Sequence, residues 1–410
     1  MTPARQTTML INAAHSFTHY CLLILPTAVL AMARPGGPFG DEYGPILALA
    51  TGSFVLYGLM ALPQGWLAQR FGRHHLMTLF YFGTGASLVA TGLAGTPLTL
   101  GLALAAVGLF AAIYHPIGTA LLVEVAGDKP GRAIGLNGVF GNIGVAMAPM
   151  FTAFVAVRYG WHWAFILPGL ACMAVGAVWL RQPPVDHTAR KAAGKFPKIP
   201  PYMVRRAVIV LLLIAAVSGL VFNAFTLLLP KLMQERLAGA PDLLPLAGIA
   251  ATAATLCGAV TQFTVGRMID RTTLKRVFLP LGLVLAPALV ALALANGWLV
   301  VPLAGAVAAV VFGQVTVNET MTARYISPPL RTRMYSIRFF VGFLGAAIAA
   351  PLVGFLHDRF GSSSVALMVL AVFALVTLGC AVFFPDRPEE LNPELWEREL
   401  PPEGIAVAAE

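Results

Sequence analysis

The stretch at 207–229, AVIVLLLIAAVSGLVFNAFTLLL, runs for 23 residues without a single charged side chain. A bilayer core of about 30 Å is crossed by roughly 20 apolar residues in a helix, so this stretch is long enough to span it. The rest of the chain is similar: 58% of the 410 residues are hydrophobic and 11% are charged, whereas soluble domains carry about 25% charged residues. We therefore expect the chain to be solvated mostly by lipid.

Apolar runs of this kind recur along the chain and predict twelve transmembrane helices. They lie at 8–33, 44–68, 75–95, 98–124, 133–157, 161–181, 206–232, 242–266, 276–296, 298–325, 333–357 and 361–384. Two other stretches are polar, a Pro-, Lys- and Arg-rich one at 182–205 and an acidic one at 385–410. The sequence thus predicts an all-α integral membrane protein with six-helix bundles at 1–181 and 206–384, a cytosolic linker at 182–205 and a mobile cytosolic tail at 385–410.

Lys and Arg assign the two sides of the membrane. If both termini are cytosolic, 21 of the 27 basic residues lie on the cytosolic side and five on the other, with Arg338 inside a helix. This asymmetry predicts a multi-pass protein of a bacterial-type cytoplasmic (inner) membrane. It also accounts for the net charge of +9, so we expect the lipid bilayer and no nucleic acid as a partner, and we expect a monomer. The N-terminus shows no small-residue cleavage site, so we expect no removable signal peptide.

The two halves of the sequence repeat each other. Gly65-Trp-Leu-Ala-Gln-Arg70 and Gly266-Arg-Met-Ile-Asp-Arg271 are offset by 201 residues, and the helix prolines at 149 and 351 by 202. Two parallel six-helix halves of this kind place a solute site between them near the middle of the membrane. The sequence therefore predicts a pseudo-symmetric pair of bundles.

The segment Gly65-Trp-Leu-Ala-Gln-Arg-Phe-Gly-Arg-His74 resembles the loop motif Gly-x-x-x-Asp-Arg-x-Gly-Arg-Arg of the major facilitator superfamily. The resemblance implies a cytosolic latch that holds the outward-facing state, in which arginines bind helix C-terminal carbonyls of the other half. Gln69 replaces the Asp of the motif, whereas the second copy keeps Asp270. The residues assigned to this latch are Gly65, Gln69, Arg70, Gly72, Arg73, Asp270 and Arg271.

A second segment narrows the resemblance. Tyr114-His-Pro-Ile-Gly118, followed by the glycine-rich helix that contains Asn142 and Pro149, is similar to the fosmidomycin-resistance branch, whose members are drug-efflux-like and considered proton-driven. The glycines do not fit a dinucleotide fingerprint, because no strand precedes them and no acidic residue follows at the required distance. Close helix packing through small residues is the better interpretation.

Polar side chains inside apolar helices are costly, so they mark a pathway by default. Asn12, His15 and His19 are spaced by three and four residues and share one face of the first helix. The full set assigned to a substrate or proton pathway is Asn12, His15, His19, His115, Asn142, Asn223, Gln314, Asn318, Glu319 and Arg338. The resemblance places helices 1, 4, 7 and 10 around a central cavity, where most of these residues would meet.

The three histidines have several possible roles. Histidine titrates near neutral pH, so His19 and His115 are candidates for proton coupling or solute contact. Either ring could instead hydrogen-bond a neighbouring helix. A metal site is a further alternative, but Cys21, two residues after His19, lies on another face of its helix, Glu124 lies at the far end of the helix of His115, and the four cysteines all lie in apolar runs. We therefore assign no metal and no cofactor at this point.

Glu319 and Arg338 lie at similar depths in helices 10 and 11. They could form a static ion pair, or Glu319 could exchange protons while Arg338 binds an anionic group of the solute. These observations favour a secondary transporter that exports a small organic solute by alternating access. We expect the export to be coupled to protons that move inward in exchange (antiport). An importer or facilitator of an anionic metabolite remains the alternative, and a metal or metal-chelate transporter is less favoured.

Other classes of protein fit the sequence poorly. The hydrolase motif Gly-x-Ser-x-Gly, the metalloprotease motif His-Glu-x-x-His and paired membrane aspartates are all missing, so we expect no enzyme. The phosphate-binding loop of an ATP-driven pump is missing as well. A scaffold without transport activity has no reason to bear the cost of converging polar residues in a membrane.

Overall fold

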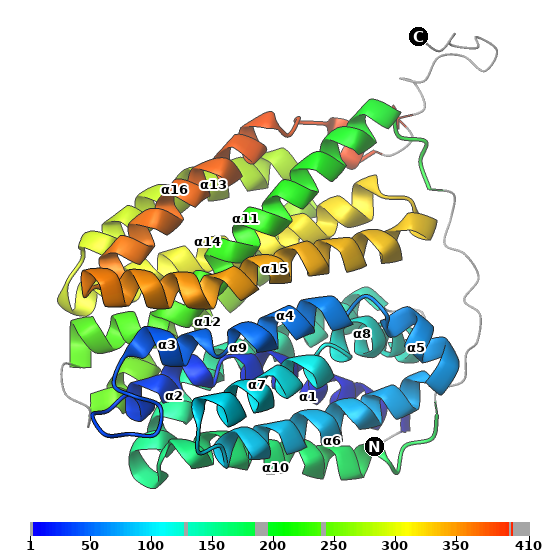
Figure 1. Ribbon diagram of the computed structural model, residues 1–410. Helices are drawn as coiled ribbons and strands as arrows, with labels where there is room; N and C mark the ends of the chain where they lie inside the picture. Colours follow the sequence, from blue (N-terminus) through cyan, green and yellow to red (C-terminus); the bar gives the residue numbers. More distant parts are fainter. Residues whose placement is uncertain (1–2, 127–129, 185–195, 239–242, 393–394, 397–410) are drawn as a thin grey trace.

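The computed structural model describes residues 3–126, 130–184, 196–238, 243–392 and 395–396, and every regular element in them is a helix (Figure 1). The first half contains α1 (Pro3–Leu22), α2 (Leu25–Met32), α3 (Tyr43–Ala48), α4 (Thr51–Met60), α5 (Gln64–Phe71), α6 (Arg73–Gly92), α7 (Pro97–Ala111), α8 (Tyr114–Ala126), α9 (Pro130–Tyr159) and α10 (Trp161–Trp179). The second half contains α11 (Pro201–Met233), η1 (Gln234–Ala238), α12 (Leu244–Ile269), α13 (Leu274–Leu294), η3 (Gly297–Leu299), α14 (Val300–Tyr325), α15 (Pro328–Phe360), α16 (Ser363–Phe383) and η4 (Pro388–Glu390).

Within the described residues, eleven helical segments are long and apolar enough to cross a membrane, and each matches a predicted span. The remaining predicted span, 75–95, corresponds to α6, which begins with Arg73, His74 and His75 and is not among the eleven. Helices α11 and α15 start earlier than predicted, each with a proline in its first turn. Apolar content could not reveal these starts, because the added turns contain arginines and extend beyond the apolar stretch.

Prolines divide several spans into two helices. Helix α1 ends at Leu22 and α2 carries Pro26 in its first turn, while α7 ends at Ala111 and α8 carries Pro116. A proline lacks the backbone N–H and its ring collides with the carbonyl four residues earlier, which favours the interruption of the helix before Pro26 and Pro116. The break before α8 places His115 in the first turn of a new helix.

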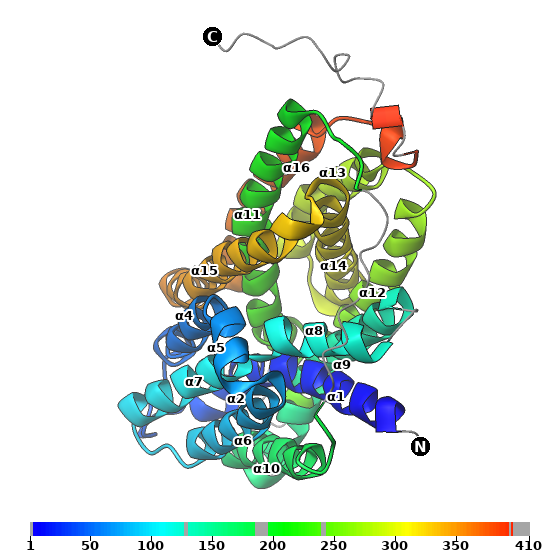
Figure 2. The same ribbon diagram turned by 90° about the vertical axis from the view of Figure 1, so that its right-hand side faces the viewer.

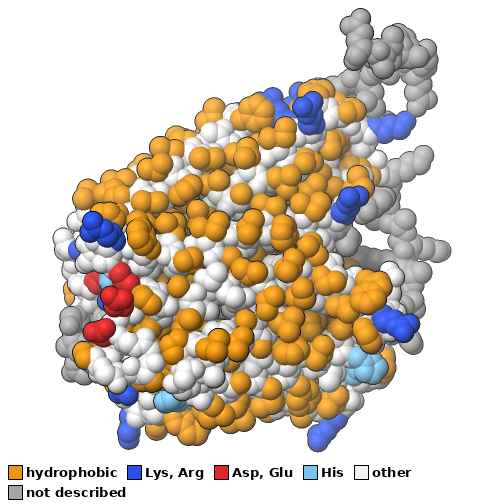
Figure 3. Space-filling view, viewed as in Figure 1, with side chains coloured by type: hydrophobic (Ala, Val, Ile, Leu, Met, Phe, Trp, Pro, Cys, Tyr) orange, Lys and Arg blue, Asp and Glu red, His pale blue; other side chains and the backbone are white. Residues whose placement is uncertain are grey.

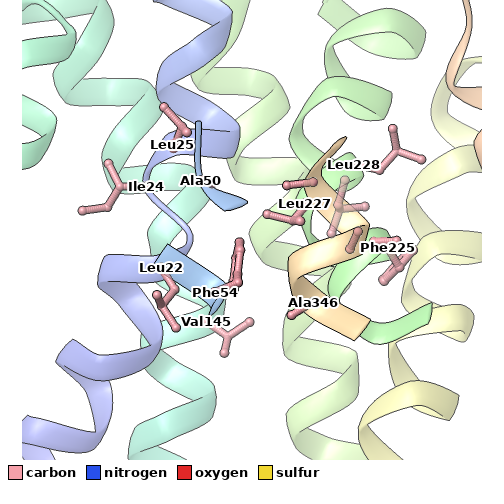
Figure 4. Packing of buried hydrophobic residues seen from close by; sticks show 14 of the residues in the cluster. Leu22, Ile24, Leu25, Ala50, Phe54, Val145, Phe225, Leu227, Leu228 and Ala346 are labelled. Carbon is pink, nitrogen blue, oxygen red and sulfur yellow. The ribbon is translucent and has the colours of Figure 1, made fainter. Parts of the chain in front are cut away.

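The helices form two groups (Figures 1 and 2). Helices α1–α10 lie in the lower part of both views and α11–α16 in the upper part. The main contacts between the groups are made by α3 and α4 with α15, by α9 with α12 and by α2 with α11. Buried apolar side chains pack along this junction: Leu22, Phe54 and Val145 come from the first group, and Phe225 and Ala346 from the second (Figure 4).

The outer surface is largely apolar. Hydrophobic side chains cover most of the face in Figure 3, while Lys and Arg gather toward its edges. Large apolar residues such as Leu93, Leu98 and Val372 are largely exposed on the outer surface. A soluble protein rarely exposes continuous apolar patches of this extent, so the surface confirms that the helices are surrounded by lipid.

The halves close against each other at the end of the bundle that carries α3 and η1. The Asp358 carboxylate accepts a hydrogen bond from the Gly44 backbone N–H at 2.9 Å, which joins α15 to α3. A Cβ atom on Gly44 would lie 2.8 Å from the Gly354 backbone, so the two helices can approach this closely only because both residues are glycine. On the second half, His357 contacts the Glu235 carboxylate at 2.7 Å.

The opposite end carries α5 and the end of α16, and there part of the predicted mobile tail is docked. The Glu390 side chain is completely buried and accepts hydrogen bonds from the Tyr325 hydroxyl, the Leu274 backbone and Arg324. Trp396 packs with its ring centroid 6.0 Å from that of Tyr325. The prediction of a mobile tail is therefore wrong for these residues, and 397–410 lie outside the described residues.

Candidate functional site

The three histidines singled out by the sequence meet in the first half. His15, His19 and His115 each offer one ring nitrogen, and these three atoms all lie within 4.8 Å of one another. The Nε2 atoms of His15 and His19 are 3.2 Å apart. The ring centroid of His115 is 5.2 Å from each of the other two. We call these residues the histidine cluster.

The position of each ring follows from the helices that carry it. His15 and His19 are four residues apart in α1 and therefore lie on one face, one turn above the other. Gly141 of α9 makes room for the first of them, since a Cβ there would lie 2.6 Å from the His15 ring. Gly141 and Gly144 of α9 thus serve close helix packing, as predicted, whereas an added Cβ on Gly135 or Gly138 would meet nothing within 4 Å.

A buried asparagine connects the cluster to neighbouring helices. The Asn137 backbone carbonyl lies 2.7 Å from His15 Nδ1. Because a carbonyl can only accept, Nδ1 of His15 carries the proton of this bond. The Asn137 amide donates to Asn12 Oδ1 at 2.8 Å and to the Tyr114 hydroxyl at 2.7 Å. The Tyr114 ring in turn stacks on His15 at 4.9 Å.

The second half reaches this cluster through Phe339 of α15. The ring centroids of Phe339 and His115 are 4.9 Å apart. Phe339 is also flanked by Arg338, whose guanidinium carbon lies 5.5 Å from the ring centroid. Arg338 Nη2 is 3.8 Å from Glu319 Oε1, and the two side chains are 11% and 50% exposed. Phe339 therefore contacts both His115 of the cluster and Arg338 of the charged pair.

Four other predicted pathway residues take no part in this network. Asn142 donates to Gln262 across the α9–α12 contact, and Asn223 donates to the Gly219 carbonyl one turn earlier in α11. In α14, both side-chain polar atoms of Gln314 and the Oδ1 of Asn318 are buried without a hydrogen-bond partner in the described part of the chain. The structure thus unites the first-half residues and the Glu319–Arg338 pair, but leaves these four separate.

The predicted latch is not formed in this structure. Arg73 pairs with Glu124 of α8, which belongs to the same half. Gln69, Arg70, Asp270 and Arg271 are exposed, and an added Cβ on Gly65 would meet nothing within 4 Å. A role for these residues in holding the outward-facing state stays a prediction.

Several residues of the site were missed by the sequence analysis. Asn137 lies five residues before Asn142 in the same apolar helix, so the rule that marked one polar residue could have marked both. Tyr57 and Phe339 lie near His115, with ring centroids 6.2 and 4.9 Å away. No pattern in the sequence distinguishes these two from the many lipid-facing aromatic residues.

A family description, Major Facilitator Superfamily, matches residues 17–247 and 240–407 of the chain. The chain belongs to this superfamily. This confirms the predicted family and fold, and proteins of this family and fold are transporters, not enzymes. The fosmidomycin-resistance branch stays a prediction.

Two curated relatives resemble parts of this superfamily member. An uncharacterized MFS-type transporter of Bacillus subtilis (strain 168), YfnC, is 34% identical over 115 residues, which is 27% of this chain. The Multidrug resistance protein B homolog of Mycobacterium tuberculosis (strain CDC 1551 / Oshkosh) is 27% identical over 146 residues, which is 34% of this chain. The chain spans 27% of the length of each relative in these matches.

Solved structures share the fold over most of the chain. A bacterial homolog to the human lysosomal transporter Spinster, in an inward-facing and occupied conformation, aligns with a TM-score of 0.68 and 15% identity over 98% of both chains. The inward-facing and unoccupied conformation gives a TM-score of 0.66 over 93% of this chain and 94% of that one. At this identity the likeness concerns the fold alone.

Proposed function

We propose that the protein is a secondary active transporter that exports a small organic solute by alternating access in exchange for protons. The observation that carries the proposal is the meeting of ionisable side chains from both halves at Phe339, which contacts His115 of the histidine cluster and Arg338, the partner of Glu319. Such groups are costly inside a membrane protein unless they serve a solute or ion pathway. A multidrug-resistance homolog among the relatives is consistent with export.

The closed and open ends of the bundle fit the alternating-access part of the proposal. At one end, Gly44 and Asp358 join the halves. At the other end, α5 and α8 make their main contacts within the first half. By the distribution of Lys and Arg, we assign this second end and both termini to the cytosol of a bacterial-type inner membrane. The conformation described here is then open to the cytosol, and the latch residues would meet when the halves rock the other way.

We assign proton carriage to Glu319. Half of its side chain is exposed, so water can reach the carboxylate, and its nearest cation is Arg338 at 3.8 Å. In an exchange mechanism, solute and proton compete for this carboxylate: the solute leaves when the proton arrives. Competition of this kind is the simplest way for one carboxylate to couple two opposite fluxes.

An anionic solute would give the alternative mechanism, and Arg338 favours it. Protonation of Glu319 would release Arg338, which could then bind a carboxylate of the solute. Proton and solute would bind together and move in the same direction, so the protein would be an importer. The two mechanisms therefore predict opposite effects of a proton gradient.

Reconstituted proteoliposomes test the proposal. With a panel of small organic solutes inside right-side-out vesicles, an inward proton gradient should accelerate efflux of at least one solute, without ATP. Glu319→Gln should abolish the effect of the gradient and also weaken solute binding, because the carboxylate for which both compete is lost. Glu42→Gln, at an exposed carboxylate just before α3, is the matched control. Acceleration of uptake by the same gradient would select the import mechanism, and no flux of any solute would contradict transport.

A further inference from the structure

We propose that His15, His19 and His115 bind a divalent first-row transition-metal ion, which the protein carries as a complex with a small anionic chelator. This inference rests on the proposed function only in treating the metal as cargo. The sequence alone offers no reason to prefer a metal, because no cysteine or carboxylate lies on the histidine face of α1 or directly beside His115 in α8. The structure removes that objection, since it brings a third imidazole from α8 to the two on α1.

The spacing of the ring nitrogens fits a metal. Zn²⁺ binds histidine nitrogens at about 2.0–2.1 Å in a tetrahedral arrangement, which places neighbouring nitrogens about 3.3 Å apart. The Nε2 atoms of His15 and His19 are 3.2 Å apart, and all three ligand atoms lie within 4.8 Å. Small rotations of the rings therefore complete the geometry. Two histidines four residues apart on one helix face are also the spacing found in helical zinc sites.

The surroundings of His15 prepare it as a ligand. Its Nδ1–H donates to the Asn137 carbonyl at 2.7 Å, so in the neutral ring the lone pair is on Nε2, which points at His19. Metal-binding histidines commonly donate their other ring N–H to a carbonyl, which fixes the tautomer and the orientation. Asn137 is itself held by Asn12 and Tyr114. His15 is thus oriented before any metal arrives.

The two other rings are able to supply the remaining ligands. Among the described residues, the hydrogen-bond partner of His19 Nε2 is His15 Nε2. A shift of the His19 proton from Nε2 to Nδ1 exposes a second lone pair toward the cluster. His115 Nε2 is buried and has no hydrogen-bond partner among the described residues. A buried polar atom without a partner calls for an explanation such as an ion or a water molecule, and a metal shared by the three rings provides one.

The charge of the surroundings selects the form of the cargo. Arg338 and His115 both contact Phe339, so a bare dication at the cluster would add charge near an existing cation. Two like charges in a poorly solvated space repel strongly. Three histidines also leave one tetrahedral position open, as in zinc sites that bind water or substrate. An anionic donor of a small chelator fills that position and offsets the charge.

Cobalt binding to the purified full-length protein in detergent tests the site, because tetrahedral Co²⁺ has a strong visible absorption. We expect one Co²⁺ per chain for the unaltered protein, and at least a 100-fold loss of affinity for His19→Ala and for His115→Ala. The matched control is His162→Ala, since His162 also contacts a backbone carbonyl, that of Gly92, but lies outside the cluster. His115→Cys should retain binding and add a thiolate charge-transfer band, which a misfolded variant cannot do.

Transport assays separate the failure of this inference from the failure of the proposed function. Proteoliposomes loaded with Co²⁺–citrate should show cobalt flux that His19→Ala reduces at least tenfold and His162→Ala preserves. If the protein moves organic solutes but His19→Ala binds Co²⁺ as tightly as the unaltered protein, the metal site is refuted and transport stands. If Co²⁺ binds at the three histidines but no solute or chelate moves, transport is refuted and only the site stands.

Discussion

Two groups of buried amides differ between the halves: Asn12 and Asn137 of the first half are joined by hydrogen bonds, whereas Gln314 and Asn318 of the second have side-chain atoms without partners among the described residues. In the first half, Asn137 connects Asn12, His15 and Tyr114 through hydrogen bonds. In the second, Gln314 is 1% exposed, and neither of its side-chain polar atoms has a partner among the described residues. The two halves of a pseudo-symmetric transporter therefore do not contribute equally to a site. The first half presents a joined network beside the histidine cluster, and α14 presents amide groups that are available to a ligand or to another conformation.

The largest effect on stability should come from a change in the hydrogen-bond network around Asn137 in the first half. Asn137→Leu would leave Asn12 and Tyr114 without their buried partner, and each unsatisfied group costs about 1–3 kcal/mol. We expect a clear drop in the thermal unfolding temperature of the detergent-solubilised protein. Asn223→Leu is the matched control, because Asn223 donates only to the Gly219 carbonyl of its own helix. Equal effects of the two changes would remove the contrast between the halves.

Replacing the unpaired amide of Gln314 should have the opposite effect on stability. Gln314→Leu removes two buried polar atoms that have no partner in this conformation, and leucine keeps a comparable volume. The free energy of unfolding should therefore stay the same or rise by up to about 1 kcal/mol. The thermal unfolding temperature should accordingly be unchanged or higher. Solute flux should nevertheless fall, because the amide is available to a ligand or to the outward-open state. A destabilised Gln314→Leu protein would show that the amide has a partner, and a fully active one would show that it has no role in transport.

The sequence predicted the fold well because lipid enforces a simple rule. Apolar runs such as 207–229 must be helices, since no other open structure satisfies its backbone inside a membrane. Helix starts at Pro201 and Pro328 were missed because they lie among charged residues, where hydropathy carries no signal.

The candidate site was predicted less completely, because its members are joined by tertiary contacts. The spacing of Asn12, His15 and His19 places them on one face, but nothing local shows that His115 of α8 meets them. Phe339 became part of the site only through the packing of α15 on the first half. The docking of Glu390 under Tyr325 was also out of reach, because an acidic, proline-containing tail has the composition of a disordered one.

The smallest effect on stability, and the sharpest test of the comparison, concerns Arg338. The ion pair with Glu319 spans 3.8 Å and the carboxylate is half exposed. Solvent screening keeps such pairs near 0–1 kcal/mol, well below the 3–5 kcal/mol lost when a fully buried pair is broken. Arg338→Met should therefore shift thermal unfolding only slightly. If Arg338 binds the solute, as we propose for the unpaired amide of Gln314, the Arg338→Met protein should bind anionic solutes at least tenfold more weakly.

The double replacement Arg338→Met with Glu319→Gln decides between the two roles of the arginine. A static pair predicts that the double variant recovers the flux that Arg338→Met loses, because no charge is left unpaired. A solute-binding arginine predicts that the double variant stays as impaired as Arg338→Met, since the counter-charge for the solute is still missing. Unfolding and solute binding measured on both single variants and the double form a complete cycle. Because the Glu319 side chain is half exposed, it does not depend on Arg338 as a partner, and we expect no recovery.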